Sequence, residues 1–382
     1  MKKIPYGKQL IDKKDKKLVF DALSNELITT GPIVKRFELK LKKFFKCKYS
    51  YTCSSGPAAL HLAMLSAGLK KNDTILMPAI NFIASYNMAK IMNLKVYLVD
   101  VDKLTGQITP DKIEECIKKN KLKKLKALVI MYHGGYPENS KNFYKLKKKY
   151  NFLIIEDACH ALGSEYFYKN QLYKIGSCKH ADISTFSLHP VKTITTGEGG
   201  IITTNNFNIA KNIKLYRNHG ILRAKKNYWE YDIVDHGFNY RLSDINSALG
   251  LSQLKKINKF LKQRKKIYDY YISEFTNFNS YFKTPKYSNI GKFSFHLFLI
   301  NIEFNKLKKN KKHFMRYLLG NNIITQQHYI PIYKFRAYKE NSRYFPGAEK
   351  FFDNSLSIPI FVDLSFAKQK FVIKTIKDYF KN

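Results

Sequence analysis

Short apolar runs alternate with segments of helical apolar spacing through the first half of the chain, and this alternation constrains the fold more than any other feature. The apolar runs have strand length and fall near residues 49–53, 74–77, 95–99, 126–131 and 152–156. The segments with helical spacing cover 12–24, 33–45, 57–67, 82–92, 110–120 and 138–150, with a later one at 206–217. Because strands separated by helices are typical of crossover units, we predict an α/β fold with a largely parallel sheet flanked by helices.

One lysine stands out in a chain with 68 Lys and Arg residues. Lys192 lies in STFSLHPVKTITTGEGG, residues 184–200, and it is the only Lys, Arg, Asp or Glu between 183 and 197. Most lysines are solvated surface residues, so an isolated lysine in such a stretch needs a specific reason. The strand-like run that ends at Asp157 adds a carboxylate, and ligands of open α/β sheets bind at the carboxyl ends of strands.

These residue types match the needs of an enzyme that holds pyridoxal phosphate on a lysine. Such an enzyme needs an amine that reacts with the cofactor aldehyde, a carboxylate that keeps the pyridine nitrogen protonated, and donors for the phosphate. Lys192 could supply the amine, since a lysine held away from water is a better nucleophile at neutral pH. Asp157 could face the pyridine nitrogen, and Ser187 could offer a hydroxyl close to the lysine.

Four segments occur in a fixed order along the chain. They are SSGPAAL at 54–60, EDACHALG at 156–163, SLHPVKTITTGEGG at 187–200 and GFNYRLSDINSALG at 237–250. With them the chain resembles, nearly end to end, the sugar-nucleotide aminotransferases of the DegT/DnrJ/EryC1/StrS family. The resemblance implies the pyridoxal-phosphate-dependent transferase fold type I, which is aspartate aminotransferase-like, and L-glutamate as the amino donor.

Further segments narrow the resemblance to one branch of this family. They are IPYGKQLID at the start, LITTGPIVKRFE after it, and QQHYIPIY with FPGAEKFFDNSLSIPIF near the end. They are similar to the transaminases of pseudaminic acid biosynthesis, which aminate C4 of a UDP-4-keto-6-deoxy-N-acetylhexosamine for surface glycans. A GDP- or dTDP-4-keto-6-deoxy sugar stays an alternative substrate, because residues that recognise the base cannot be read from the sequence.

The resemblance assigns cofactor contacts residue by residue. Lys192 would carry the cofactor and move the proton between the donor and cofactor carbons, while Asp157 would pair with the pyridine nitrogen. His160 stands where many relatives have Gln, close to the cofactor's ring hydroxyl, although its apolar setting also suits a core histidine. Phe82 matches the aromatic side chain that lies on the pyridine face, although core packing alone could place a Phe there.

Phosphate donors are expected where SSGPAAL opens a helix, because a helix N-terminus presents free N–H groups to an anion. Gly56 and Ala58 are the candidates there. Pro57 departs from the family pattern, which usually has Thr, and so removes both a hydroxyl and an N–H. Ser187 and Asn239 would supply the other contacts. In the family this Asn comes from the neighbouring subunit, so the resemblance implies a homodimer with shared active sites.

Substrate contacts are expected from several segments. Arg241 could hold the diphosphate of the nucleotide or the carboxylate of glutamate, because its planar fork suits both anions. An ion pair with Asp244 or another carboxylate is the structural alternative for this arginine. By resemblance, the sugar site would be lined by Tyr6, Thr30, Gly31, His328 and Tyr329. His328 could instead be an ordinary histidine at the end of a strand.

Two domains of unequal size are expected. Helical apolar spacing extends from 243 to about 276 and would join them. A strand-like run at 293–302 and a terminal helix near 365–380 follow. We therefore predict a large cofactor-binding domain with the N-terminal segment over residues 1–255, and a smaller C-terminal α+β domain over 256–382.

The formal net charge of +39 raises a competing hypothesis, a protein that binds nucleic acid. The basic residues are spread along the expected helices, as in KLKKKY at 145–150, and no nucleic-acid motif is present. We therefore expect no specific nucleic-acid partner, and a positive field would instead speed the encounter with a nucleotide-sugar dianion. A catalytically silent relative acting as a regulator is disfavoured by the presence of Lys192 and Asp157.

Cysteine usage and hydropathy bear on the location of the protein. The five cysteines show no C-x-x-C pair and no zinc spacing, so we expect reduced thiols, a cytoplasmic protein and no metal site. The N-terminal MKKIPYGKQLIDKKDKK lacks the apolar core of a signal peptide. The longest apolar stretch, residues 75–89, is interrupted by Pro78 and by polar residues, so no membrane span is expected.

Overall fold

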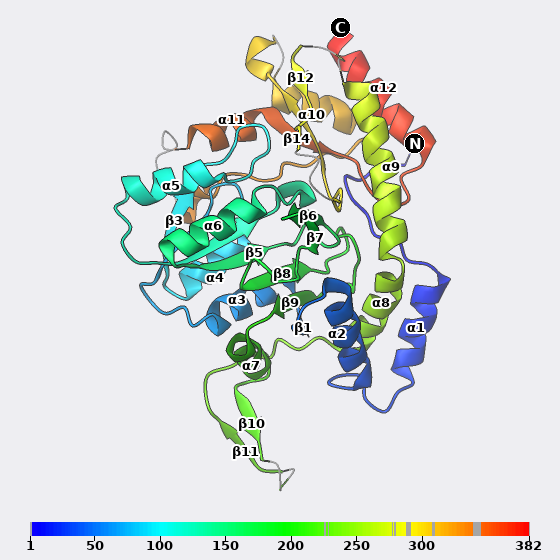
Figure 1. Cartoon of the computed structure of the whole chain (residues 1–382). Helices are drawn as coiled ribbons and strands as arrows, with labels where there is room; N and C mark the ends of the chain where they lie inside the picture. The colour runs from blue at the N-terminus through cyan, green and yellow to red at the C-terminus, as the bar shows by residue number, and fades with distance from the viewer. Residues whose placement is uncertain are drawn as a thin grey trace.

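The computed structural model describes residues 2–224, 227, 229–276, 278, 280–287, 292–307, 310–338 and 345–381. In this part of the chain a seven-stranded sheet forms the centre of the molecule (Figure 1). Its strand order is β1 (Tyr49–Cys53), β9 (Gly200–Thr204), β8 (Ile183–Ser187), β5 (Leu153–Asp157), β4 (Leu125–Met131), β2 (Thr74–Pro78) and β3 (Lys95–Val99). Only β9 runs against its neighbours, so the expected largely parallel sheet is confirmed.

Each helix expected between the strands is present, with ends within about two residues of the prediction, a difference that assignment methods themselves show. They are α1 (Lys13–Leu23), α2 (Pro32–Phe45), α3 (Gly56–Ser66), α4 (Ala84–Ile91), α5 (Pro110–Lys119), α6 (Ser140–Tyr150) and α7 (Phe207–Tyr216). Figure 1 shows α5 and α6 on one side of the sheet and α3 on the other. Helix α3 is buried along nearly its whole length, because it packs against α4, α7 and β8.

The N-terminal segment is fixed by local capping and by one ion-pair cluster. The Asp12 side chain accepts hydrogen bonds from the N–H groups of Lys14 and Asp15, and the Asp15 carboxylate accepts one from the Asp12 N–H. Such a capping box satisfies N–H groups at both sides of a helix start. Lys256 Nζ contacts both carboxylates, at 2.9 and 2.6 Å, and so ties the start of α1 to the end of α8 (Asp244–Lys255).

The long helical segment expected from 243 to 276 is divided in two. Helix α8 ends at Lys255, and α9 (Ile257–Phe275) begins after Lys256, whose ψ of −1° departs from helical geometry. The expected domain boundary at 255/256 falls at this junction. A second hydrophobic core is formed mainly by residues from Ile267 of α9 onward. It also includes Ile4 and Tyr136 from the first part of the chain. The boundary itself stays a prediction.

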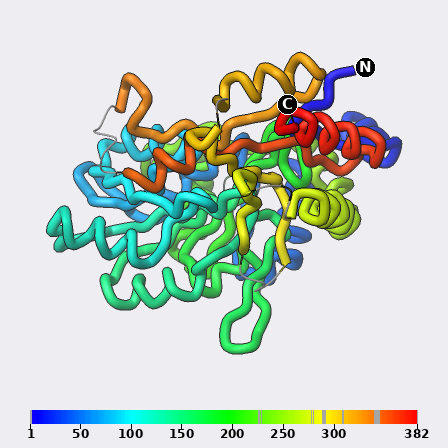
Figure 2. Tube along the Cα trace, turned by 90° about the horizontal axis from the view of Figure 1, so that it is seen from above, coloured from blue at the N-terminus to red at the C-terminus, as the bar shows by residue number. Residues whose placement is uncertain are grey.

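The C-terminal part has its own antiparallel sheet, covered by helices. The described elements are β12 (Phe282–Lys283), α10 (Lys311–Gly320), α11 (Pro346–Asn354), α12 (Phe366–Lys381), β13 (Phe298–Ile302) and β14 (Ser355–Ile358). The terminal helix is therefore confirmed. The N-terminal segment crosses to this part, where Ile4 forms a parallel bridge with Ile323 (Figure 2).

The strand expected over 293–302 is wrong in its first half, since only Phe298–Ile302 is extended. Before it, the backbone hydrogen-bonds to the large sheet's loops instead of to a neighbouring strand. The Ser294 N–H donates to Ser164 Oγ at 3.0 Å, and the His296 N–H donates to the Gly134 carbonyl at 3.0 Å. The buried Arg264 guanidinium also donates a hydrogen bond to the His296 carbonyl. These contacts hold this segment against the candidate site.

Two hairpins were not expected from the sequence. Strands β6 (Glu165–Tyr168) and β7 (Gln171–Lys174) form one of them. The other, β10 (Ile221–Arg223) with β11 (Tyr231–Ile233), projects away from the body of the molecule (Figure 1). It exposes large apolar side chains to solvent, among them Leu222, Tyr231 and Ile233. None of the helices in the described ranges combines the length and apolar character that crossing a membrane requires.

Candidate active site

A cavity of about 460 Å³ opens where β4, β5 and β8 end, because Met131, Asp157 and Ser187 are all in its wall. Most of the residues expected in the site line it: Tyr6, Gly56, Phe82, Asp157, His160, Ser187, Lys192, His328 and Tyr329. They come from both halves of the chain. The carboxyl ends of parallel strands are the usual ligand site of an open α/β sheet.

Asp157 is the last residue of β5 and is only 3% exposed. Its Oδ2 accepts a hydrogen bond from the Ser85 hydroxyl at 2.8 Å, and the Cys159 N–H approaches Oδ1 at 3.4 Å. Within the described ranges no Lys, Arg or His nitrogen lies within ion-pair distance of this carboxylate. A buried carboxylate without a cation is costly, so this site favours a ligand that brings a positive charge or an N–H donor.

Lys192 follows β8 in a turn, where its N–H donates to the His189 carbonyl at 2.9 Å. Burial lowers the pKa of its ammonium, and the nearby Cys159 and Asp157 act in the opposite direction. No described carboxylate comes within 4.0 Å of its Nζ. An amine and a carboxylate therefore face one cavity without touching each other, which leaves room for a ligand that contacts both.

The start of α3 lies directly against Ser187. A side chain on Gly56 would bring its Cβ within 2.9 Å of the Ser187 Cβ, so only glycine permits this approach. Pro57 fits the first helical turn, where an N–H has no partner within the helix. The Ala58 N–H is already taken by the Ser55 hydroxyl at 3.1 Å, and Ala58 does not line the cavity. Ser55 lines it instead, and the sequence interpretation missed this residue.

His160 has a fixed tautomer. The Gly134 N–H donates to its Nδ1 at 3.3 Å, so the proton of the neutral ring is on Nε2, which donates to the Tyr329 hydroxyl at 2.9 Å. Burial, and then the charge of Lys192, hold the pKa of His160 well below its usual range. The ring is therefore neutral. His160 is buried, as the core alternative expected, but it also lines the cavity, as the cofactor role expected.

Three more buried histidines surround His160. His296, which sequence reasoning missed, lines the cavity with its ring centroid 4.2 Å from that of His160. His328 lies beside Tyr6, at 5.3 Å between ring centroids, and its Nδ1 is 2.8 Å from the Ser357 hydroxyl. Burial lowers the pKa of His133 to about 4. Three of these four rings, those of His160, His296 and His328, line the cavity, and burial lowers the pKa of each, so they face it as neutral imidazoles. His296 occurs in a strand-like run without any motif, so nothing in the sequence marked it.

Phe82 lies at the edge of the cavity and is 50% exposed. Its ring centroid is 5.6 Å from that of Tyr329, which comes from the far end of the chain. Two aromatic side chains from distant segments therefore flank the cavity. That arrangement suits a flat ring bound between Asp157 and Lys192.

Five predicted residues do not line the cavity of their own chain: Ala58, Thr30, Gly31, Asn239 and Arg241. The Gly31 N–H donates to the Asp244 carboxylate at 2.7 Å, and so do the N–H groups at the start of α2. Asp244 is thereby engaged. The alternative of an Arg241–Asp244 ion pair is wrong, because Arg241 Nη1 donates to the Asn218 side chain at 2.7 Å.

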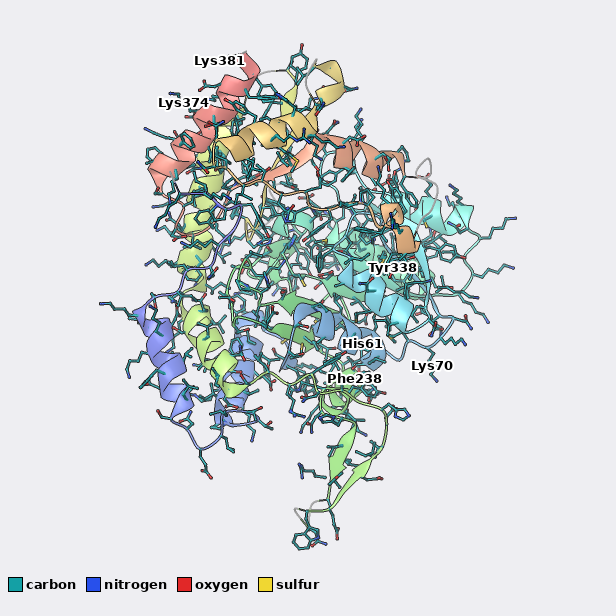
Figure 3. All side chains as sticks on the ribbon, turned by 180° about the vertical axis from the view of Figure 1, so that it is seen from behind. His61, Lys70, Phe238, Tyr338, Lys374 and Lys381 are labelled. Atoms are coloured by element: carbon teal, nitrogen blue, oxygen red, sulfur yellow. The ribbon has the colours of Figure 1, made fainter. Side chains whose placement is uncertain are left out.

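Asn239 is held at the base of the projecting hairpin. Phe238 and Tyr240 on either side of it pack against His61 of α3, with a ring distance of 4.9 Å for the Phe238 contact. Figure 3 shows His61 and Phe238 side by side, near the hairpin. The His61 Nδ1 also lies 3.2 Å from the Tyr240 hydroxyl. These contacts anchor the segment, and Asn239 itself is exposed and does not line the cavity.

Comparisons with known proteins agree with this geometry. A UDP-4-amino-4,6-dideoxy-N-acetyl-beta-L-altrosamine transaminase of Campylobacter jejuni subsp. jejuni serotype O:23/36 is 38% identical over 375 residues, which are 98% of this chain and 96% of the relative. The structure of Helicobacter pylori PseC, an aminotransferase involved in the biosynthesis of pseudoaminic acid, has a TM-score of 0.88 and 30% identity over 100% of both chains.

A putative sugar aminotransferase, Spr1654 from Streptococcus pneumoniae, was solved in its PLP form. It has a TM-score of 0.88 and 26% identity, and the match covers 98% of each chain. The family model of the DegT/DnrJ/EryC1/StrS aminotransferases matches residues 9–377. The chain belongs to the DegT/DnrJ/EryC1/StrS aminotransferase family.

Proposed function

We propose that the protein is a pyridoxal-phosphate-dependent sugar-nucleotide aminotransferase. It moves an amino group from L-glutamate to C4 of a UDP-4-keto-6-deoxy-N-acetylhexosamine, a step toward pseudaminic or a related nonulosonic acid of surface glycans. The observation that carries the proposal is the pairing of Asp157 and Lys192 in one cavity without contact between them. The printed activity of the Campylobacter jejuni relative supports the choice of sugar.

The cavity residues fit the cofactor. Asp157 offers the buried carboxylate that a pyridine nitrogen needs, and Lys192 offers an amine in the wall of the same cavity. Gly56, Ser55 and Ser187 form a close cradle at the start of α3, where helix N–H groups favour a phosphate. Pyridoxal phosphate, when bound, supplies an electron sink that makes a proton on the amino-bearing carbon acidic.

The chain's own groups then have distinct tasks. Asp157, kept in place by Ser85, holds a proton on the ligand nitrogen that faces it. Lys192 takes a proton at Nζ and returns it, and burial favours this by lowering the pKa of its ammonium. The neutral His160 donates to the Tyr329 hydroxyl, which leaves the Tyr329 O–H to donate to a ligand without adding charge.

We further propose that the enzyme works as a homodimer with shared active sites. Thr30, Gly31, Asn239 and Arg241 lie outside the cavity of their own chain, so a second copy would have to bring them to it. The projecting β10–β11 hairpin exposes apolar side chains that a second copy would cover. In that arrangement Asn239 would complete the phosphate contacts, and Arg241 would hold the nucleotide diphosphate or the glutamate carboxylate.

A panel of UDP-, GDP- and dTDP-linked 4-keto-6-deoxy sugars with L-glutamate tests the substrate. The proposal predicts formation of a 4-amino sugar from the UDP-linked N-acetylhexosamine, with lower kcat/KM for the other nucleotides. Preference for a GDP- or dTDP-linked sugar would establish the alternative substrate. Turnover of none of them, with the cofactor bound, would refute sugar-nucleotide amination.

A further inference from the structure

The amide of Gln327 has a fixed orientation in the cavity wall. Its Oε1 accepts a hydrogen bond from the Lys311 ammonium, which also donates to the Phe352 carbonyl. A lysine ammonium has donors and no acceptor, so only the oxygen of the amide can face it. Lys311 therefore decides which end of the Gln327 side chain remains available to a ligand.

Lys311 stands in a place that is unfavourable for a cation. It is the first residue of α10, and positive charge is destabilising at a helix N-terminus. Its surroundings are largely buried, and none of the carboxylates in the described ranges comes within 4.0 Å of its Nζ. The ammonium is instead 4.9 Å from the centre of the Phe352 ring. A residue that breaks local rules without an ion pair is expected to serve a function.

The NH₂ group of Gln327 is only partly used. An amide NH₂ has two hydrogens. One hydrogen is directed at the Ser355 hydroxyl at 3.4 Å, and the described contacts include no acceptor for the second hydrogen. The Lys311 charge on the oxygen side polarises the amide and makes the remaining hydrogen a stronger donor. The cavity wall thus has an oriented donor next to His328.

We propose that Gln327 is a specificity-determining contact for the nucleotide sugar, and that Lys311 is a positioning residue that orients it. The Gln327 NH₂ donates to an oxygen acceptor on the sugar end of the substrate, such as a hydroxyl or an N-acetyl carbonyl. This inference rests on the proposed function. The inference goes beyond that function because neither residue is part of the cofactor site, and neither was among the predicted substrate contacts.

Steady-state kinetics of the holoenzyme provide the main test. Lys311→Met removes the charge and keeps a similar side-chain length, and replacing a buried cation with an apolar group is often tolerated. We expect the KM for the UDP-4-keto sugar to rise about tenfold, the size of one charge-assisted hydrogen bond. The values of kcat and of the KM for glutamate should stay within about twofold, since Lys311 touches neither the cofactor nor Lys192.

A second substitution separates orientation from general damage. Gln327→Glu gives Lys311 a carboxylate partner, so the melting temperature should rise, while the KM for the nucleotide sugar should rise more than tenfold because the donor is lost. Gln9→Glu is the matched control. It adds the same charge at an exposed glutamine that does not line the cavity, and should change this KM by less than about threefold.

Different results would contradict the inference about Gln327 and Lys311 and the proposed function. An unchanged nucleotide-sugar KM in Lys311→Met, or equal effects of Gln9→Glu and Gln327→Glu, would overturn the inference while leaving the proposed function intact. Absence of any nucleotide-sugar turnover by the wild type would overturn both. In that case the melting temperatures still decide the contact itself, because Gln327→Glu should stabilise the wild type and should not stabilise the Lys311→Met variant.

Discussion

The Ser85 hydroxyl donates to Asp157 Oδ2 at 2.8 Å, and this contact between α4 and the end of β5 sets the direction of the carboxylate. Asn81 in turn donates to Ser85 Oγ at 3.3 Å. With Oδ2 engaged, Oδ1 is the oxygen with capacity left for a ligand. The carboxylate is therefore aimed into the cavity by a short chain of buried polar groups.

Substitutions at Asp157 and Ser85 should have effects of different size. Asp157→Asn should retain some cofactor and lose most of kcat, because a neutral amide cannot hold a proton on the pyridine nitrogen. Ser85→Ala should cost only about tenfold in cofactor affinity, since it loosens the carboxylate without removing it. Cofactor titration and single-turnover rates measure both. Near-normal rates in Asp157→Asn would remove this residue from the mechanism.

The close approach of Gly56 to Ser187 gives a prediction about the cofactor cradle. Gly56→Ala would place its Cβ 2.9 Å from the Ser187 Cβ, so the start of α3 must shift. We expect cofactor affinity to fall at least tenfold, measured by equilibrium dialysis. Gly320→Ala is the control, because nothing lies within 4 Å of a Cβ there, and it should bind the cofactor normally.

Tyr329 should matter through its hydrogen bond to His160. Tyr329→Phe removes the acceptor of the Nε2–H and the hydroxyl donor in the cavity, but keeps the ring that packs near Phe82. A hydrogen bond of this kind contributes about 1 kcal/mol, so the KM for the keto sugar should rise about fivefold. An effect confined to protein stability would show that the pair serves packing alone.

Lys311 gives a pH dependence with a definite sign. Burial lowers its pKa to about 7, with Lys334 acting in the same direction and Asp353 against it. The ammonium therefore loses its charge as the pH rises through about 7, and the nucleotide-sugar KM should rise with it. In the unfolded chain the lysine keeps its proton to a higher pH, so its contribution to stability increases from about pH 7 upward. Lys311→Met should remove both trends, which pH-rate profiles and melting curves would report.

Shared active sites predict complementation between inactive subunits. Lys192→Ala removes the amine, and Asn239→Asp puts a negative charge where a phosphate contact is proposed. Heterodimers of the two variants should regain part of the activity, because one of their two cavities combines an intact lysine with an intact asparagine. No recovery in verified heterodimers would place both residues in the same chain's site.

The crossover part of the fold could be predicted because local and tertiary preferences agree there. Helices α1 to α7 and strands β1 to β5 have the apolar periodicity that burial of one face or of a whole strand requires. The 293–297 segment shows the opposite case. It has strand-like composition, but its backbone hydrogen bonds go to Ser164 and Gly134 instead of to a neighbouring strand. These partners are set by the packing of the C-terminal part against the large sheet.

The site was predictable only where a motif carried its chemistry. Asp157, His160, Ser187 and Lys192 come from two ordered segments and do meet in one cavity. Ser85, His296 and Gln327 reach the same place from an ordinary helix, an irregular segment and a loop. Their roles depend on neighbours far away in the chain, so even Gln327, which stands in the QQHYIPIY segment, could not be given a role from the sequence.

Reduction of the holoenzyme with borohydride, followed by peptide mass mapping, tests the central claim most directly. The intact enzyme should absorb at about 420 nm, and reduction should fix the cofactor on the peptide that contains Lys192. Lys192→Ala should lack both the absorbance and the tag while keeping its fold. A tag on another lysine, or none at all on a fully loaded enzyme, would contradict the account.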